Sequence, residues 1–187
     1  MAENTDMRQK AGDGSVQYQS GGAMTINNHK PKTRLSTLFE KLTSEFNDGD
    51  EITHIIDELQ SYTSERDIIG LEQKLIDGNR SHLFSAVSWY KQEYAKKLEK
   101  FQFYPSAQKI HSIVLAIVLD KFSAHITPMI NEGANEADIS RKISEEVVAP
   151  IFKIIEEEGF EDVMGLTMSD INGMIYYLTG KCHIKWN

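Results

Sequence analysis

The sequence predicts an all-α protein, with about seven helices in a single globular domain, a glycine-rich, strand-like arm before it and a short extended end. From Thr33 onward, apolar residues recur with the 3.6-residue period of amphipathic helices. No internal segment of the body shows the strict alternation of a strand. A length of 187 residues, 40% of them hydrophobic and 26% charged, suits one soluble globular domain.

Residues 1–32 form a region of their own, rich in Gly, Gln, Asn and Ser. Two short alternating pieces flank a Ser-Gly-Gly sequence, one with Val16 and Tyr18 and the other with Met24 and Ile26. Two interpretations stay open. Low hydrophobicity favours a disordered tail, while the alternation favours a strand-forming arm. A lone hairpin is marginal in water, so such an arm would need a partner, which these four apolar side chains would contact.

The helical body, residues 33–187, is expected to begin with three short helices. Their apolar stripes are Leu35, Leu38, Phe39, Leu42 and Phe46; then Ile52, Ile55, Ile56 and Leu59; and then Ile68, Ile69, Leu75 and Ile76. Ser64 and Asp67 have the spacing of a capping box before the third helix. Such short helices need tertiary burial of their stripes for most of their stability.

Four longer helices are expected in the second half of the chain. They span Ser81 to about Phe101, Ala107 (capped by Ser106) to about Thr127, a run opened by Asn135 with Asp138, and Ser169 (after Thr167 with Asp170) to Thr179. The stretch Ile113–Leu119 is apolar nearly all round, so its helix should be central. It is far shorter than the roughly 20 residues that a membrane span needs. Pro150 lies inside an apolar helical pattern and predicts a kink or a break.

The chain ends with a second change of period. Cys182, Ile184 and Trp186 alternate with His183 and Lys185, as in a strand. Burying a tryptophan contributes about 2–3 kcal/mol. Residues 182–186 are therefore expected to be a docked extended end, held either on the chain's own body or on a partner.

The sequence contains no recognisable set of catalytic, cofactor-binding or metal-binding residues. Its six histidines and single cysteine show no HExxH or CxxC spacing. Neighbouring strand residues point to opposite faces, so Cys182 and His183 are a poor pair for catalysis or for a metal. His111 is expected at the edge of the core with one hydrogen bond. We therefore expect no enzyme activity, no cofactor and no metal, which favours a binding or assembly protein.

The net charge indicates which partners the protein can bind, and the cysteine content indicates the compartment in which it works. A net charge of −8 argues against general binding of polyanions. Lys91, Lys96, Lys97 and Lys100 cluster on one predicted helix, either as a solvated face or as a nucleic-acid contact inside a larger complex. One cysteine and a start without signal-peptide features fit a reducing cytosol, so a cytoplasmic protein without membrane association is expected.

Two segments carry a family resemblance. The ending from Gly173 to Trp186, Gly-Met-Ile-Tyr-Tyr-Leu-Thr-Gly-Lys-Cys-His-Ile-Lys-Trp, resembles that of helical subunits and domains in ABC-three-component systems. These are bacterial conflict systems related to Lamassu anti-phage defence. The opening Gln9–Gln17, with Ile26-Asn27 after the glycines, is similar to short glycine-rich starts on some of these proteins.

The resemblance implies a non-catalytic adaptor that works beside an SMC-like ATPase and a separate effector, which it tethers or restrains. It implies contact-forming or core-completing roles for Tyr176, Leu178, Gly180, Cys182, His183, Ile184 and Trp186. Of these, Tyr176, His183, Ile184 and Trp186 are the predicted partner-binding residues. The alternative is a self-assembling homo-oligomer in which residues 16–26 build an intermolecular sheet.

Overall fold

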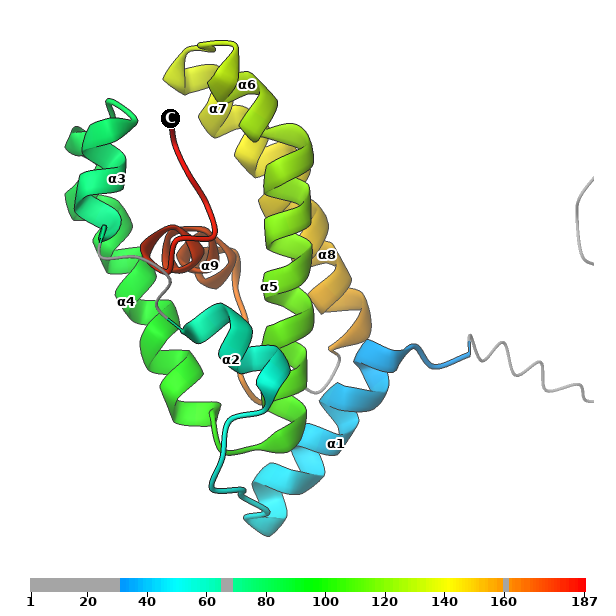
Figure 1. Cartoon of the computed structure of the whole chain (residues 1–187). Helices are drawn as coiled ribbons and strands as arrows, with labels where there is room; N and C mark the ends of the chain where they lie inside the picture. The colour runs from blue at the N-terminus through cyan, green and yellow to red at the C-terminus, as the bar shows by residue number, and fades with distance from the viewer. Residues whose placement is uncertain (1–30, 65–68, 160–161) are drawn as a thin grey trace, which may run out of the picture. The chain divides into compact units, whose positions relative to one another are not determined.

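The structure is a computed structural model, and it describes residues 31–64, 69–159 and 162–187. The chain divides into two compact units, Met1–Pro31 and Lys32–Asn187. The second unit is shown in Figure 1 as coloured helices. The predicted arm contacts Val16, Tyr18, Met24 and Ile26 lie outside the described residues, as does Asp67 of the predicted capping box.

The described part of the second unit is all helical, and no strand occurs in it. Its elements are α1 (Arg34–Asp48), α2 (Asp57–Thr63), α3 (Leu71–Asp77), η1 (Ser81–Leu83), α4 (Phe84–Phe101), α5 (Pro105–His125), α6 (Thr127–Asn131), α7 (Glu136–Lys142), η2 (Ile143–Val148), α8 (Ala149–Glu158) and α9 (Met168–Gly180). The 3₁₀ turn η1 leads into α4, α6 follows α5 after one residue, and α7, η2 and α8 are continuous. These residues therefore form seven helical runs, which confirms the predicted fold class.

The apolar helix α5 is the centre of the unit, as predicted. It contacts α1, α2, α4, α6, α8, α9 and the π-helical segment η2 (Figure 1). Its most deeply buried apolar residues are Ala107, Ile110, Val114, Leu115, Val118 and Phe122. The run Pro105–Asn131 is also long and apolar enough to cross a membrane by length and composition, a property that a central core helix shares.

The start of α5 is held by α1 rather than by its own cap. Pro105 takes the first helical position, where its missing N–H costs nothing, so the helix begins before the predicted Ala107. The predicted cap Ser106 instead donates its backbone N–H to Glu45 Oε2 (2.9 Å) and its hydroxyl to Oε1 (2.6 Å). A carboxylate from α1 thus satisfies a first-turn amide and faces the positive end of the α5 dipole.

The second predicted helix is shorter than its apolar pattern suggests. Residues 52–56 form a loop, and α2 begins only at Asp57. Gln108 of α5 is fully buried and holds this loop. Its Oε1 accepts the Ile56 N–H (2.6 Å), and its Nε2 donates to the carbonyl of His54 (2.9 Å). Tertiary hydrogen bonds to the backbone therefore replace the helical bonds that the apolar period predicted.

The helical run from Glu136 to Glu158 passes Pro150 without a break. Residues Ile143–Val148 form a π-helical turn immediately before it. The Ala149 N–H donates to the Ser144 carbonyl, five residues back. A proline ring normally clashes with the carbonyl four residues earlier, and a widened turn removes that clash. The irregularity predicted at Pro150 is therefore a π-bulge and not a break in the helix.

Two predicted helix starts are confirmed in detail. The Asn135 side chain accepts the Asp138 N–H (2.9 Å) at the start of α7. At the start of α9, Thr167 accepts the Asp170 N–H (3.3 Å), and Asp170 Oδ2 accepts the Thr167 N–H (2.8 Å). This reciprocal capping box fixes where α9 begins and therefore where the C-terminal segment leaves it.

Candidate functional site: the C-terminal segment and its surroundings

The long helices α4 and α9 meet at Gly173. A Cβ atom there would lie 2.4 Å from the Tyr90 carbonyl oxygen and 2.6 Å from Tyr94 Cβ, so only glycine permits this approach. Near the start of α9, Lys97 Nζ of α4 lies 2.6 Å from Asp170 Oδ2. Both side chains are largely buried, so this ion pair joins the two helices.

The C-terminal segment, residues 182–187, turns back from α9 and runs between α3 and α5 (Figure 1, red). Cys182 has a left-handed φ of 66°, and the His183 N–H donates to the Leu178 carbonyl (2.9 Å). The extended end predicted here forms no β-ladder within the described residues. The alternation of side chains nevertheless survives, because Ile184 and Trp186 are 2% and 3% exposed. The intervening Lys185 points to solvent.

Trp186 is surrounded by the unit's own side chains. Its Nε1 donates to Thr179 Oγ1 (3.1 Å). Its ring meets Phe122 edge-on at 5.2 Å and stacks on Tyr176 at 5.9 Å with an interplanar angle of 7°. The Arg80 guanidinium lies 5.3 Å from the ring centroid. The tryptophan therefore closes the core between α5, α9 and the end of α3.

The end of α3 holds this segment through its backbone. Lys74 Nζ is buried and donates to the Thr179 carbonyl at the end of α9 (2.8 Å). Arg80 donates to the carbonyls of Gly78 (2.5 Å) and Trp186 (3.2 Å). Carbonyl oxygens thus accept hydrogen bonds from both buried cations, while Arg80 Nε is buried without a partner among the described residues.

A buried polar pair lies where α4 and α5 pack. The Tyr94 hydroxyl and His111 Nδ1 are 3.3 Å apart, and neither side chain is exposed. Burial lowers the pKa of His111 to about 4 and raises the pKa of Tyr94 well above its usual value. His111 is therefore a neutral core residue, deeper than the predicted core edge, with this one hydrogen-bonding partner among the described residues.

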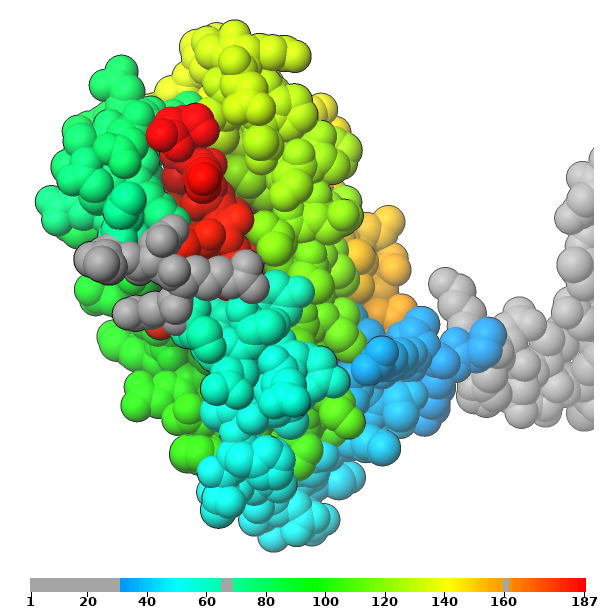
Figure 2. All heavy atoms as spheres, viewed as in Figure 1, coloured from blue at the N-terminus to red at the C-terminus, as the bar shows by residue number. Residues whose placement is uncertain are grey.

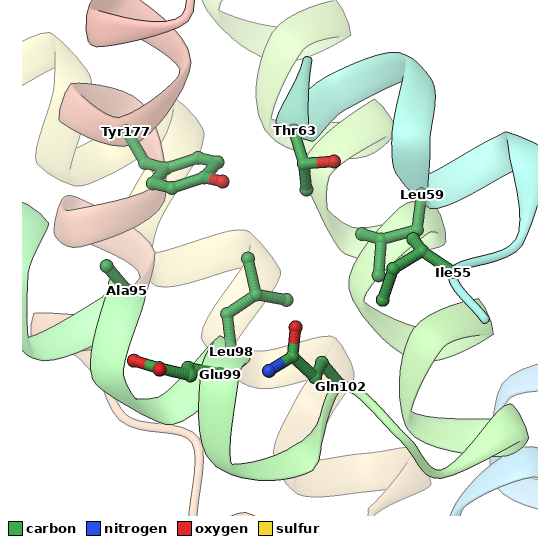
Figure 3. A pocket seen from close by; sticks show the side chains of 8 residues that line it. All are labelled: Ile55, Leu59, Thr63, Ala95, Leu98, Glu99, Gln102 and Tyr177. Atoms are coloured by element: carbon green, nitrogen blue, oxygen red, sulfur yellow. The ribbon is translucent and has the colours of Figure 1, made fainter. Parts of the chain in front are cut away.

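A pocket of about 180 Å³ lies between α2, α4 and α9 (Figure 3). Its lining consists of Ile55, Leu59, Thr63, Ala95, Leu98, Glu99, Gln102 and Tyr177. Aliphatic side chains project into the space between the helices, and Thr63, Glu99 and Gln102 supply polar atoms beside it (Figure 3). Such a pocket has room for one large apolar side chain. In the described residues, no group of three or more His, Cys, Asp or Glu is placed to hold a metal.

The family follows from the sequence of this same region. The family model for C-terminal domain 9 of the ABC-three-component systems matches residues 70–186. The chain belongs to this family. The match begins one residue before α3 and ends at Trp186, so it covers every contact of the C-terminal segment described above. A domain of a three-component system associates with other components of that system. No curated protein and no solved structure matches the chain.

Within this ABC-three-component domain, the predicted partner-binding residues hold the C-terminal segment in place. Ile184 and Trp186 are buried inside the unit. Tyr176 is half-buried against Trp186, and burial raises its pKa to about 12. His183 is half-buried, with its ring 5.5 Å from the Tyr62 ring. Of the four, only Tyr176 and His183 present part of a side chain to solvent.

The four lysines predicted as a nucleic-acid contact are in different environments. Lys97 donates to the Gly165 carbonyl (2.6 Å) in addition to its ion pair with Asp170. Lys96 is paired with Glu93 on the surface (2.7 Å). Lys100 lies over the Phe101 ring at 5.0 Å, and the Lys91 side chain packs beside Gly180. A nucleic-acid contact by these lysines stays a prediction, and of the four Lys97 is the one that ties two helices of the domain together.

No pattern in the sequence predicted the roles of several residues that stabilise this region. Gln108, Glu45 and Lys74 act by reaching backbone groups far away in the chain. The pocket residues Thr63 and Gln102 come together only because α2 and α4 both pack against α5. A single sequence carries periodicity and caps, but it does not show which helices become neighbours.

Proposed function

We propose that this chain is a non-catalytic adaptor subunit of an anti-phage defence complex. It tethers or restrains an effector beside an SMC-like ATPase. The observation that carries the proposal is the family match over residues 70–186, more than half of the chain, to a C-terminal domain of ABC-three-component systems.

The use of polar groups in the domain supports a binding role. The carboxylates of Glu45 and Asp170 cap helices, and the cations of Lys74 and Lys97 tie helices together. The buried histidine His111 is held neutral in the core. These groups stabilise a rigid helical scaffold, which is what an adaptor needs in order to present surfaces to several partners.

The proposed partners are other components of an ABC-three-component system. We propose that the domain contacts the ATPase and the effector together in the cytoplasm, and that it works without cofactor or metal. Exposed apolar residues of the helical unit are available for such contacts; these are Phe46, Ile69, Ile76, Trp89, Phe103 and Met168.

Two assays test the proposal. The purified full chain is assayed for hydrolysis of ATP, DNA and RNA, and the system is expressed in a phage-sensitive host with and without this chain. The adaptor role predicts no hydrolysis by the chain alone. It also predicts that omitting the chain abolishes protection or makes the remaining components toxic without phage.

Hydrolysis that a single substitution in this chain removes would contradict the proposal. So would full protection and normal growth when the chain is omitted. A catalytically dead ATPase component serves as the control that shows the system is active in the host.

A further inference from the structure

The central helix α5 leaves apolar surface uncovered. The run Pro105–Asn131 is long and apolar, and α5 within it is only partly covered by the rest of the unit. Ile113, Ala116 and Ile117 remain partly exposed. Figure 2 shows α5 open to solvent between the C-terminal segment and α8. A helix that is apolar on every side is normally covered on every side.

Part of this surface is the floor of a groove of about 310 Å³ between α1, α2 and α5, here called the α5 groove. Its lining is Arg34, Glu58, Ser61, Tyr62, Lys109, Ser112, Ile113 and Ala116. The α5 members have the spacing i, i+3, i+4 and i+7 and so share one helical stripe. Small residues on the floor, Ser112 and Ala116, allow a partner's backbone to approach closely.

The charges of the α5 groove differ from those of the chain as a whole. The chain has a net charge of −8. The groove has two cations, Arg34 and Lys109, against one carboxylate, Glu58. Both cations are exposed, and no hydrogen bond or ion pair joins them to another described residue. A segment that brings carboxylates to this rim would complement it.

The fold also selects the form of the occupant. An extended peptide binds well where it can add a strand to a sheet edge, and the described residues contain no strand. A groove between helices with a helical apolar stripe instead fits an amphipathic helix. The walls from α1 and α2 precede the matched family region, while the floor from α5 lies inside it.

We propose that the α5 groove binds an acidic amphipathic helix of another protein component of the system. Its apolar stripe packs on Ile113 and Ala116, and its carboxylates pair with Arg34 and Lys109. This inference rests on the proposed function, because it names the surface through which the adaptor takes one partner.

The test uses the tagged full chain co-expressed with the other components of its system. The Arg34→Glu/Lys109→Glu double variant reverses the charge of the exposed rim of the groove, and Ala116→Glu places a carboxylate on its floor. Ala124→Glu is the matched control, because Ala124 lies on the same helix, is exposed and is outside the groove. Co-purified partner should fall about tenfold for the first two variants and stay unchanged for the control. Wild-type binding should weaken from about 0.15 M to about 0.5 M salt.

A photo-crosslinking residue at position 116 then identifies the occupant. The proposal expects cross-links to an acidic helical segment of one partner. Cross-links to residues 1–31 of this chain, or to a second copy of it, would overturn it. Binding that is unchanged in both the rim and the floor variants would also overturn it and leave the proposed function standing. Failure of the wild-type chain to bind any component would instead count against the proposed function.

Discussion

Gly78 and Trp186 are in direct contact, although they are far apart in sequence. A Cβ atom at position 78 would lie 2.6 Å from the Trp186 carbonyl oxygen and 2.7 Å from its Cβ. The end of α3 and the last residues of the chain therefore pack backbone against backbone. This contact lies near the two limits of the matched family region, residues 70 and 186. The C-terminal segment is thus an integral part of the domain.

The two tryptophans give a matched test of this packing. Trp186 is 3% exposed and Trp89 is 55% exposed. Trp186→Ala should lower the free energy of unfolding by about 3–5 kcal/mol, because it leaves a cavity and removes the hydrogen bond to Thr179. Trp89→Ala should change it by less than about 0.5 kcal/mol. Urea unfolding followed by circular dichroism measures both, and equal losses would contradict the predicted placement.

Two glycines of α9 test the approach of α4. A Cβ at Gly173 would meet the Tyr90 backbone at 2.4 Å, whereas a Cβ at Gly180 would meet the flexible end of Lys91 at 2.9 Å. Gly173→Ala should destabilise the domain by about 1–3 kcal/mol through overpacking. Gly180→Ala should be neutral or stabilising by up to about 1 kcal/mol. Thermal melts compare them, and a stabilising Gly173→Ala would show that α4 lies farther from α9.

The ion pair Lys97–Asp170 between α4 and α9 should contribute more to the free energy of unfolding than the neighbouring surface pair Lys96–Glu93. The Lys97 and Asp170 side chains are 21% and 6% exposed, while Lys96 and Glu93 are 69% and 42% exposed. Lys97→Met leaves Asp170 without its cation and should cost about 2 kcal/mol or more. Lys96→Met should cost less than about 1 kcal/mol. Chemical denaturation tests this, and equal costs would rule out a buried tie between the helices.

His111 should make stability fall in mild acid. Burial lowers its pKa from 6.5 to about 4, with Asp170 opposing the shift and Lys97 adding to it. As the pH drops below 6.5, the unfolded chain takes up a proton that the folded chain refuses. The contribution of this neutral histidine to the free energy of unfolding is therefore fully present above about pH 6.5. It decreases as the pH falls to about 4, and the total loss is about 3 kcal/mol.

The comparison uses His111→Gln, which keeps a hydrogen-bonding group beside Tyr94. Urea unfolding from about pH 7.5 to about pH 4.5 should show the wild type losing stability relative to this variant. His82→Gln, at an exposed site, controls for the loss of a surface histidine. Parallel pH profiles for the wild type and His111→Gln would mean that the buried imidazole titrates normally.

Apolar periodicity and helix-capping residues predicted much of the fold. The central position of α5 followed from its all-round apolar sequence, and the starts of α7 and α9 followed from Asn135 and Thr167. The differences from the prediction have both distant and local causes. Gln108 draws residues 52–56 into a loop, and a π turn absorbs Pro150. The extended end pairs with no strand among the described residues, because it packs on Gly78.

The candidate site was less predictable than the fold. The apolar alternation of Ile184 and Trp186 indicated burial, yet it did not show whether the covering surface belonged to the chain or to a partner. The lysines of α4 are close in sequence, but Lys97 turns inward to Asp170 and Lys100 lies over a ring. The pockets beside α2 depend on helix neighbours, which periodicity does not encode.

The most direct test of the adaptor role is the solution mass of the full chain, by light scattering, alone and mixed with the other purified components of its system. The adaptor role predicts a stable complex whose mass equals the sum of this chain, 21.3 kDa per copy, and at least one other component. A chain that elutes separately from every other component, or assembles only with itself, would contradict it.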